Sequence, residues 1–195
     1  MIIKLIDRNQ ALVDAWKKEF VNCDNVEVLH GDIFSFDFDC IVSPANSFGF
    51  MDGGIDAVIS DYIGWNIGYI VREVIKKDFD SELLVGQALT VETGHDKVPY
   101  LISAPTMRVP LHIQNTPNVY LAAKAIFLQL KKTKLPIKSV GIPGLGTGVG
   151  KMDYTQCAMQ MKQAYNDFYL DNAENIVTLG DAVKLYRRNI YGERS

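Results

Sequence analysis

Short runs of apolar residues alternate along this chain with longer segments in which apolar residues recur every third or fourth position. A short apolar run is typical of a strand buried in a parallel sheet, and the longer spacing is typical of a helix with one buried face. The runs predict strands at residues 2–6, 26–29, 40–43, 88–92, 100–103, 139–143 and 176–179. Their alternation with helices predicts an α/β fold, a three-layer α/β/α sandwich around a mixed, mainly parallel sheet.

The segments between the strands predict helices, and several have residues typical of a helix start or end. Asp7 or Asn9 is placed to cap the first helix, and Asn66 is placed to cap the third. The second helix is predicted over residues 55–62 and stops at Gly64. Further helices are predicted to begin at Asn118, to follow a cap at Asp153 and to cover residues 182–190.

The length and composition of the chain favour one domain over residues 1–195. The hydrophobic content of 48% is enough for a full core. The formal net charge is −3 and the basic residues are scattered, which argues against binding duplex nucleic acid through a basic patch. The first residues do not resemble a signal peptide and no apolar window is long enough to span a bilayer, so we expect no membrane association.

The three cysteines, Cys23, Cys40 and Cys157, lie far apart in the sequence, each in apolar surroundings. No pair of cysteines and no Cys/His cluster has the spacing of zinc ligands, so we expect neither a metal site nor a disulfide. Buried thiols that stay reduced are typical of a cytoplasmic protein, and we expect that location.

Two glycine-containing loops each connect a predicted strand to a predicted helix, one over residues 44–56 and one over residues 144–150. Glycine lets the backbone adopt positive φ and lets a ligand approach the main chain closely. The helix that follows offers unpaired N–H groups and the positive end of its dipole. Because ligands bind at the carboxyl ends of parallel strands, the two loops predict a cleft for a phosphate-bearing ligand.

Four segments of the chain follow one another in a specific order and spacing: His30-Gly31-Asp32-Ile33, residues 41–47, Gly53-Gly54-Ile55-Asp56 and residues 142–148. In this order and spacing they resemble the macro domain, a module that binds ADP-ribose. The resemblance extends over nearly the whole chain. It implies ADP-ribose or an ADP-ribosylated substrate as the partner, and no cofactor or metal, since backbone amides and helix dipoles can neutralise the phosphates.

The resemblance also implies individual roles. Asp32 would accept a hydrogen bond from the adenine amino group, and Ile33 would contact the base. Asn46 would hold the hydroxyls of the distal ribose. The two loops would bind the diphosphate and the distal ribose through Gly53, Gly54, Ile55, Gly144, Leu145, Gly146, Thr147, Gly148 and Val149. Alternatively, Asp32 and Asn46 are turn residues and the glycines are loop joints.

Asp56, with Asn46, is the candidate catalytic residue. The resemblance implies that Asp56 lies beside the distal ribose, where it would activate a water or orient a substrate phosphate. An aspartate in the first turn of a helix is also favoured by the helix dipole alone, so a purely structural role stays open. Asp52 replaces a glycine found in many members, and it would point away from the ligand, bind a water or metal, or take part in the chemistry.

Other departures from the family pattern limit the expected chemistry. The first glycine loop has no lysine and Gly150 stands where one class has an aspartate, so a covalent lysine mechanism is not expected. The paired glutamates of chain-cleaving members are absent from the sequence, so chain cleavage is not expected either. The aromatic residue that often stacks on adenine is missing at residues 178–180, where Tyr186 is a candidate substitute. The long loop 104–117 carries Arg108 and His112, either as ligand contacts or as solvated residues.

The leading hypothesis is an enzyme that binds ADP-ribose and hydrolyses a group from its distal ribose. The group is either the terminal phosphate of ADP-ribose 1″-phosphate or an ester-linked protein or nucleic acid. The competing hypotheses are a non-catalytic module that reads ADP-ribose or a related nucleotide, and a structural domain whose cleft has lost its ligand.

Overall fold

The computed structural model describes residues 1–192, and the prediction of one domain over 1–195 includes three residues outside them. Its six strands form one sheet in the order β2-β1-β6-β3-β5-β4. β4 runs antiparallel to β5 and every other pair is parallel, which confirms the mixed, mainly parallel sheet. The strands are β1 (Ile2–Asp7), β2 (Val26–His30), β3 (Cys40–Ser43), β4 (Leu89–Glu92), β5 (Tyr100–Ser103) and β6 (Ser139–Ile142).

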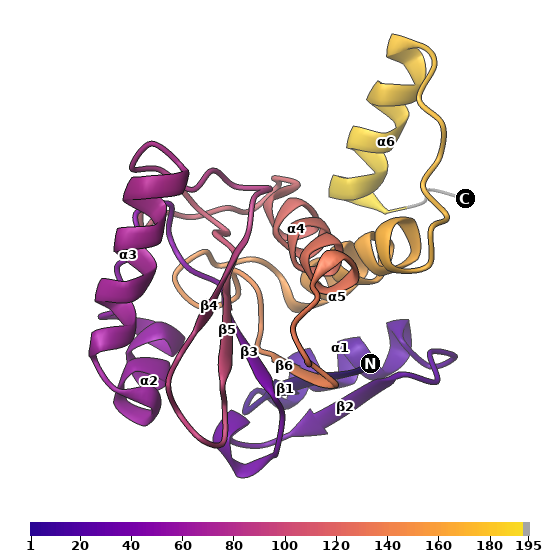
Figure 1. Cartoon of the computed structure of the whole chain (residues 1–195). Coiled ribbons are helices and arrows are strands. Elements are labelled where there is room, and N and C mark those ends of the chain that lie inside the picture. The colour runs from indigo at the N-terminus through magenta and orange to yellow at the C-terminus, as the bar shows by residue number, and fades with distance from the viewer. Residues whose placement is uncertain (193–195) are drawn as a thin grey trace.

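Helices cover both faces of this sheet, as the sequence predicts (Figure 1). On one face lie α1 (Gln10–Glu19), α4 (Asn118–Lys132) and α5 (Tyr154–Ala164), which continues into the π-helix η2 (Tyr165–Tyr169). On the other face lie α2 (Gly54–Ile63) and α3 (Asn66–Asp78). Because successive strand residues point to opposite faces, Val42 packs in the first apolar cluster and Ile41 in the second.

The C-terminal part of the fold corrects one prediction. The apolar run at 176–179 is not a strand: residues 171–178 are exposed and irregular, and α6 (Leu179–Tyr191) begins at the end of the run. Thr178 and Asp181 form a capping box, and this local signal starts a helix where β-branched residues predicted a strand. The predicted helix at 182–190 is present, begins three residues earlier, and projects from the body of the molecule in Figure 1.

The structure decides between the predicted helix caps and agrees with the predicted state of the cysteines. Asn9, and not Asp7, caps α1, accepting from the N–H groups of residues 11 and 12. Asn66 is the first residue of α3 and not its cap; that position belongs to Trp65, which has no capping side-chain bond. Cys23, Cys40 and Cys157 are free and buried, as predicted.

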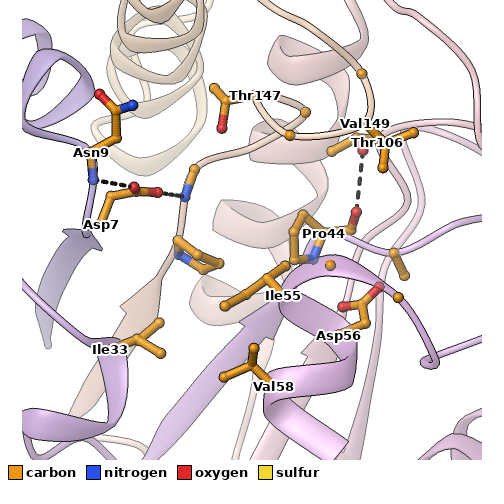
Figure 2. A pocket seen from close by; sticks show the side chains of 18 of the residues that line it. Asp7, Asn9, Ile33, Pro44, Ile55, Asp56, Val58, Thr106, Thr147 and Val149 are labelled. Carbon is orange, nitrogen blue, oxygen red and sulfur yellow. Dashed lines mark hydrogen bonds between the residues drawn. The ribbon is translucent and has the colours of Figure 1, made fainter.

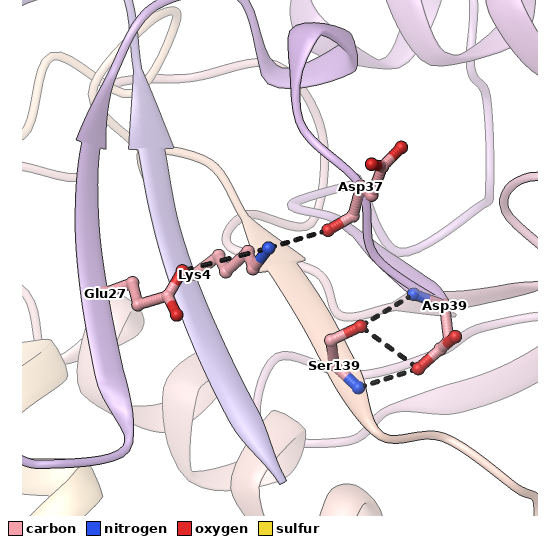
Figure 3. A network of polar contacts seen from close by, with 5 residues as sticks. All are labelled: Lys4, Glu27, Asp37, Asp39 and Ser139. Carbon is pink, nitrogen blue, oxygen red and sulfur yellow. Dashed lines mark hydrogen bonds and ion pairs between the residues drawn. The ribbon is translucent and has the colours of Figure 1, made fainter.

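A polar network fixes the amino ends of the strands, opposite the glycine loops (Figure 3). The carboxylate of Asp39 accepts hydrogen bonds from the N–H groups of Lys138 and Ser139 and from the Ser139 hydroxyl, at 2.8–3.0 Å. Burial opposes ionisation of Asp39, but these bonds hold its pKa below the ordinary value. Nearby, Lys4 Nζ donates to the Asp37 carbonyl at 2.9 Å. The Asp39 contacts thus join the segment before β3 to β6, and the Lys4 contact joins the same segment to β1.

Candidate functional site

A pocket of about 500 Å³ opens at the carboxyl ends of β1, β3 and β6, and both glycine loops line it (Figure 2). This is the arrangement that the two strand–loop–helix junctions predict. The predicted site residues that line the pocket are Asp32, Ile33, Asn46, Gly53, Gly54, Ile55, Asp56, Gly144, Gly146, Thr147, Gly148 and Val149. The pocket brings them together, while the contact of each with a ligand stays a prediction.

Leu145 is the predicted site residue that does not line the pocket. Its side chain is fully buried in the apolar cluster beneath the second loop, and its carbonyl accepts from the Cys157 thiol at 3.4 Å. The buried side chain leaves only the backbone of Leu145 for the expected ligand contact, which stays a prediction. Tyr186 lies exposed on α6 and is also outside the lining, so the expected substitute for the adenine-stacking aromatic is not at this pocket.

The second glycine loop is tied to the end of β1 and folded tightly on itself. The Asp7 carboxylate accepts from the N–H of Asn9 at 2.8 Å and from the N–H of Gly144 at 3.3 Å, as Figure 2 shows. Gly146 has a φ of +68°, and a Cβ placed there would lie 2.5 Å from the Ile113 side chain. Glycine fits this position because it adopts a positive φ readily and has no Cβ. The loop backbone is therefore fixed before a ligand arrives.

The first glycine loop is shaped by the amide of Asn46. Asn46 Nδ2 donates to the Phe50 carbonyl at 2.8 Å, and Oδ1 accepts from the Phe48 N–H at 3.1 Å. One N–H of the amide remains for a ligand. At the end of the loop, Gly53 caps α2 without a side-chain bond, which leaves the first-turn N–H groups of this helix available to an anion.

Asp56 is a buried carboxylate in the first turn of α2. It is 8% exposed, and Oδ1 accepts a hydrogen bond from the Ser43 hydroxyl at 2.7 Å. Burial raises the pKa of Asp56 to about 6; the bond from Ser43 opposes this rise, and the negative charge of Asp52 adds to it. A carboxyl group with a pKa near 6 is suited to take up a proton near neutral pH.

Asp32 lies at the other side of the pocket, next to Ile33. Its Oδ1 accepts from the N–H of Phe34 at 2.9 Å, and its Oδ2 pairs with the guanidinium of Arg8. Both bonds lower the pKa of Asp32, and the bond from Arg8 has the larger effect. The carboxylate therefore stays ionised and open to solvent, as an acceptor for a ligand N–H must be.

Comparison with known proteins identifies the family. The sequence model of the macro domain matches residues 42–161, more than half of the chain. The chain belongs to the macro domain family. An uncharacterised protein of Aquifex aeolicus is 34% identical over 153 residues, which are 78% of this chain and 88% of that protein.

Two solved macrodomains share the fold. The Oceanobacillus iheyensis macrodomain with ADP is 20% identical, with a TM-score of 0.61, over 82% of this chain and 86% of that one. The macrodomain of Mycobacterium tuberculosis DarG is 22% identical, with a TM-score of 0.59, over 70% of this chain and 87% of that one. This agreement confirms the predicted macro-domain fold.

In this macro domain the loop 104–117 forms one wall of the pocket. Thr106, Met107 and Pro110 line it, and the Thr106 hydroxyl donates to the Pro44 carbonyl at 3.2 Å (Figure 2). Arg108 is outside the lining, where it donates to Glu82 at 2.5 Å and lies over the Phe48 ring. His112 is exposed and also outside the lining. Arg108 thus anchors the loop, and the loop contributes Thr106, Met107 and Pro110 to the site.

Sequence reasoning missed several polar residues of this macro domain site, and Arg8 and Ser43 matter most for the charges in it. Arg8 lines the pocket, and Ser43 lies beneath it as the hydrogen-bond partner of Asp56. A signal for both was present, because each stands at the carboxyl end of a predicted parallel strand. Within residues 1–192 no three His, Cys, Asp or Glu side chains are grouped as metal ligands would be, and no helix is long and apolar enough to cross a bilayer.

Proposed function

We propose that this macro domain binds ADP-ribose and hydrolyses a group attached to its distal ribose. The observation that carries the proposal is the pocket itself, where two glycine loops and a buried carboxylate with a raised pKa line one cavity. The adenine would lie at Asp32, the diphosphate against the two loops and the distal ribose beside Asn46 and Asp56. Solved relatives named as complexes with ADP and with ADPR support this choice of ligand.

The proposed reaction uses Asp56 as a general base. A water oxygen forms a bond to the anomeric carbon of the distal ribose while the bond from that carbon to the leaving group breaks. Asp56 takes a proton from the water, and the leaving oxygen departs with the electron pair. The pKa of about 6 keeps most Asp56 carboxyl groups ionised at neutral pH, where they can accept this proton.

The charges of the pocket favour an ester-linked ADP-ribose over ADP-ribose 1″-phosphate. Asp52 and Asp56 are close enough for the charge of one to raise the pKa of the other. A terminal phosphate on the distal ribose would bring further negative charge beside these two carboxylates. Arg8, the sole basic side chain lining the pocket among residues 1–192, is paired with Asp32 instead.

The binding step is tested by calorimetry with ADP-ribose. Gly148 lines the pocket, and a Cβ at this position meets nothing within 4 Å, so Gly148→Val adds bulk to the pocket without disturbing the fold. We expect this variant to lose at least about tenfold in affinity, since valine would occupy space needed by the diphosphate. Gly180→Val on α6, outside the lining, should bind like wild type. No heat from wild type at high micromolar ADP-ribose would refute the proposal.

The chemical step is tested with two substrates, an ester-linked ADP-ribosyl peptide and ADP-ribose 1″-phosphate. Wild type should release ADP-ribose from the peptide, and Asp56→Asn should lose this activity while it still binds. Asp52→Asn should raise the rate on the phosphate relative to the ester by about two- to fivefold, because one repulsive charge is removed. Binding without turnover of either substrate would leave a reader of ADP-ribose as the function.

A further inference from the structure

Arg8 has a fixed backbone and a largely exposed side chain at the mouth of the pocket. It lies between Asp7, whose carboxylate holds Gly144, and Asn9, which caps α1. The carbonyl oxygen of Arg8 is 3.0 Å from His30 Nε2. Its side chain is 72% exposed and lines the pocket. The guanidinium can therefore move while its point of attachment stays in place.

The one ionic partner of Arg8 in the described structure is Asp32. Arg8 Nη2 contacts Oδ2 of Asp32, while Oδ1 of Asp32 is held by the N–H of Phe34. Oδ2 is thus the oxygen left for an exocyclic amine of a base, and the guanidinium occupies it in the absence of a ligand. A base that takes this oxygen must displace the guanidinium by a few ångströms.

The purine side of the pocket has an aliphatic surface. Ile33 and Val58 line it there, and in Figure 2 both side chains lie in the lower part of the view. Tyr154 also lines the pocket, but its ring packs against the apolar cluster under α1 and α5 and its hydroxyl accepts from Asn9 at 2.8 Å. The exposed face of a bound base is therefore within reach of a planar guanidinium, which stacks on bases as aromatic rings do.

We propose that Arg8 is the base-stacking residue of this macro domain, in place of the aromatic side chain that the sequence lacks. On binding, Arg8 exchanges its bond to Asp32 for a stack over the purine, and Oδ2 of Asp32 accepts from the exocyclic amine. The carboxylate and the guanidinium then select and cover the same base. This inference rests on the proposed binding of ADP-ribose and assigns the residue that closes its purine end.

The test is the affinity of four proteins for ADP-ribose by calorimetry: wild type, Arg8→Ala, Arg8→Lys and Arg8→Tyr. Stacking depends on a flat surface and not on charge, so Arg8→Tyr should bind like wild type. Arg8→Ala and Arg8→Lys should both weaken binding by about 5- to 150-fold, the range for loss of one base stack. Arg187→Ala, an exposed arginine on α6, is the matched control and should bind like wild type.

Other outcomes overturn the inference in distinguishable ways. If Arg8 instead neutralises the diphosphate, Arg8→Lys will retain most of the affinity and Arg8→Tyr will lose it. If the base stacks on Tyr154, Tyr154→Ala will weaken binding while all Arg8 variants bind like wild type. In both cases wild type still binds ADP-ribose and the proposed function stands. If wild type itself does not bind, the proposed function has failed and this inference with it.

Discussion

Replacing Asp56 with asparagine should stabilise the fold at neutral pH while it removes the proposed hydrolytic activity. Burial raises the pKa of Asp56 from the ordinary 3.8 to about 6. Between these two pH values the unfolded chain loses the Asp56 proton while the folded chain keeps it, so the free energy of unfolding falls as the pH rises. Well above pH 6 Asp56 is ionised in both the folded and the unfolded chain. The decrease in the free energy of unfolding is then complete and amounts to about 3 kcal/mol.

Asparagine has the shape of the protonated acid and carries no charge, so the Asp56→Asn variant avoids this loss. Its amide oxygen can still accept the hydrogen bond that Ser43 donates to Asp56 at 2.7 Å. At pH 7 and above we therefore expect the variant to be more stable than wild type by up to about 3 kcal/mol, or about 6–12 °C in Tm. Near pH 4 the two proteins should have nearly the same stability.

The assay is urea unfolding of wild type and variant from pH 4 to pH 8, with the difference between the two curves as the readout. Taking the difference removes the contributions of all other titrating groups. Asp61→Asn is the matched control, because Asp61 lies on the same helix and accepts from Trp65 Nε1 at 3.0 Å but is exposed. A constant difference between the Asp56→Asn and wild-type curves across this range would refute the reasoning.

Three further changes test the support of the site and of the sheet. Ser43→Ala removes the bond that opposes the raised pKa of Asp56, so the acidic limb of the kcat/KM profile should move up by about 1–2 pH units. Asp39→Ala should cost about 1–3 kcal/mol in urea unfolding and leave ADP-ribose affinity unchanged, and the difference should shrink below pH 3.8 as the wild-type carboxylate is protonated. Gly150→Ala places a Cβ 2.5 Å from the Gly146 carbonyl, so it should destabilise by about 1–3 kcal/mol in thermal unfolding, while Gly148→Ala should not.

The sequence by itself determined the layers of the fold and the position of the pocket. Strands and helices differ in the period of their apolar residues, and this period is set by local geometry. Glycine loops after the strands ending at Ser43 and Ile142 predicted one cleft, because carboxyl ends of parallel strands share an edge. At residues 176–179 the β-branched residues predicted a strand, but a capping box starts a helix at the end of this run.

Only the tertiary structure decided which side chains meet inside the pocket. Arg8 reaches Asp32 because β1 pairs with β2, and Ser43 reaches Asp56 because α2 packs back on β3. Leu145 stands in a glycine loop yet points into the core beneath it. Strand order and packing bring together residues that are distant in the chain. The periodic pattern of apolar residues in the sequence does not predict these contacts. They nevertheless set the charge of Asp32 and the raised pKa of Asp56, on which the proposed chemistry depends.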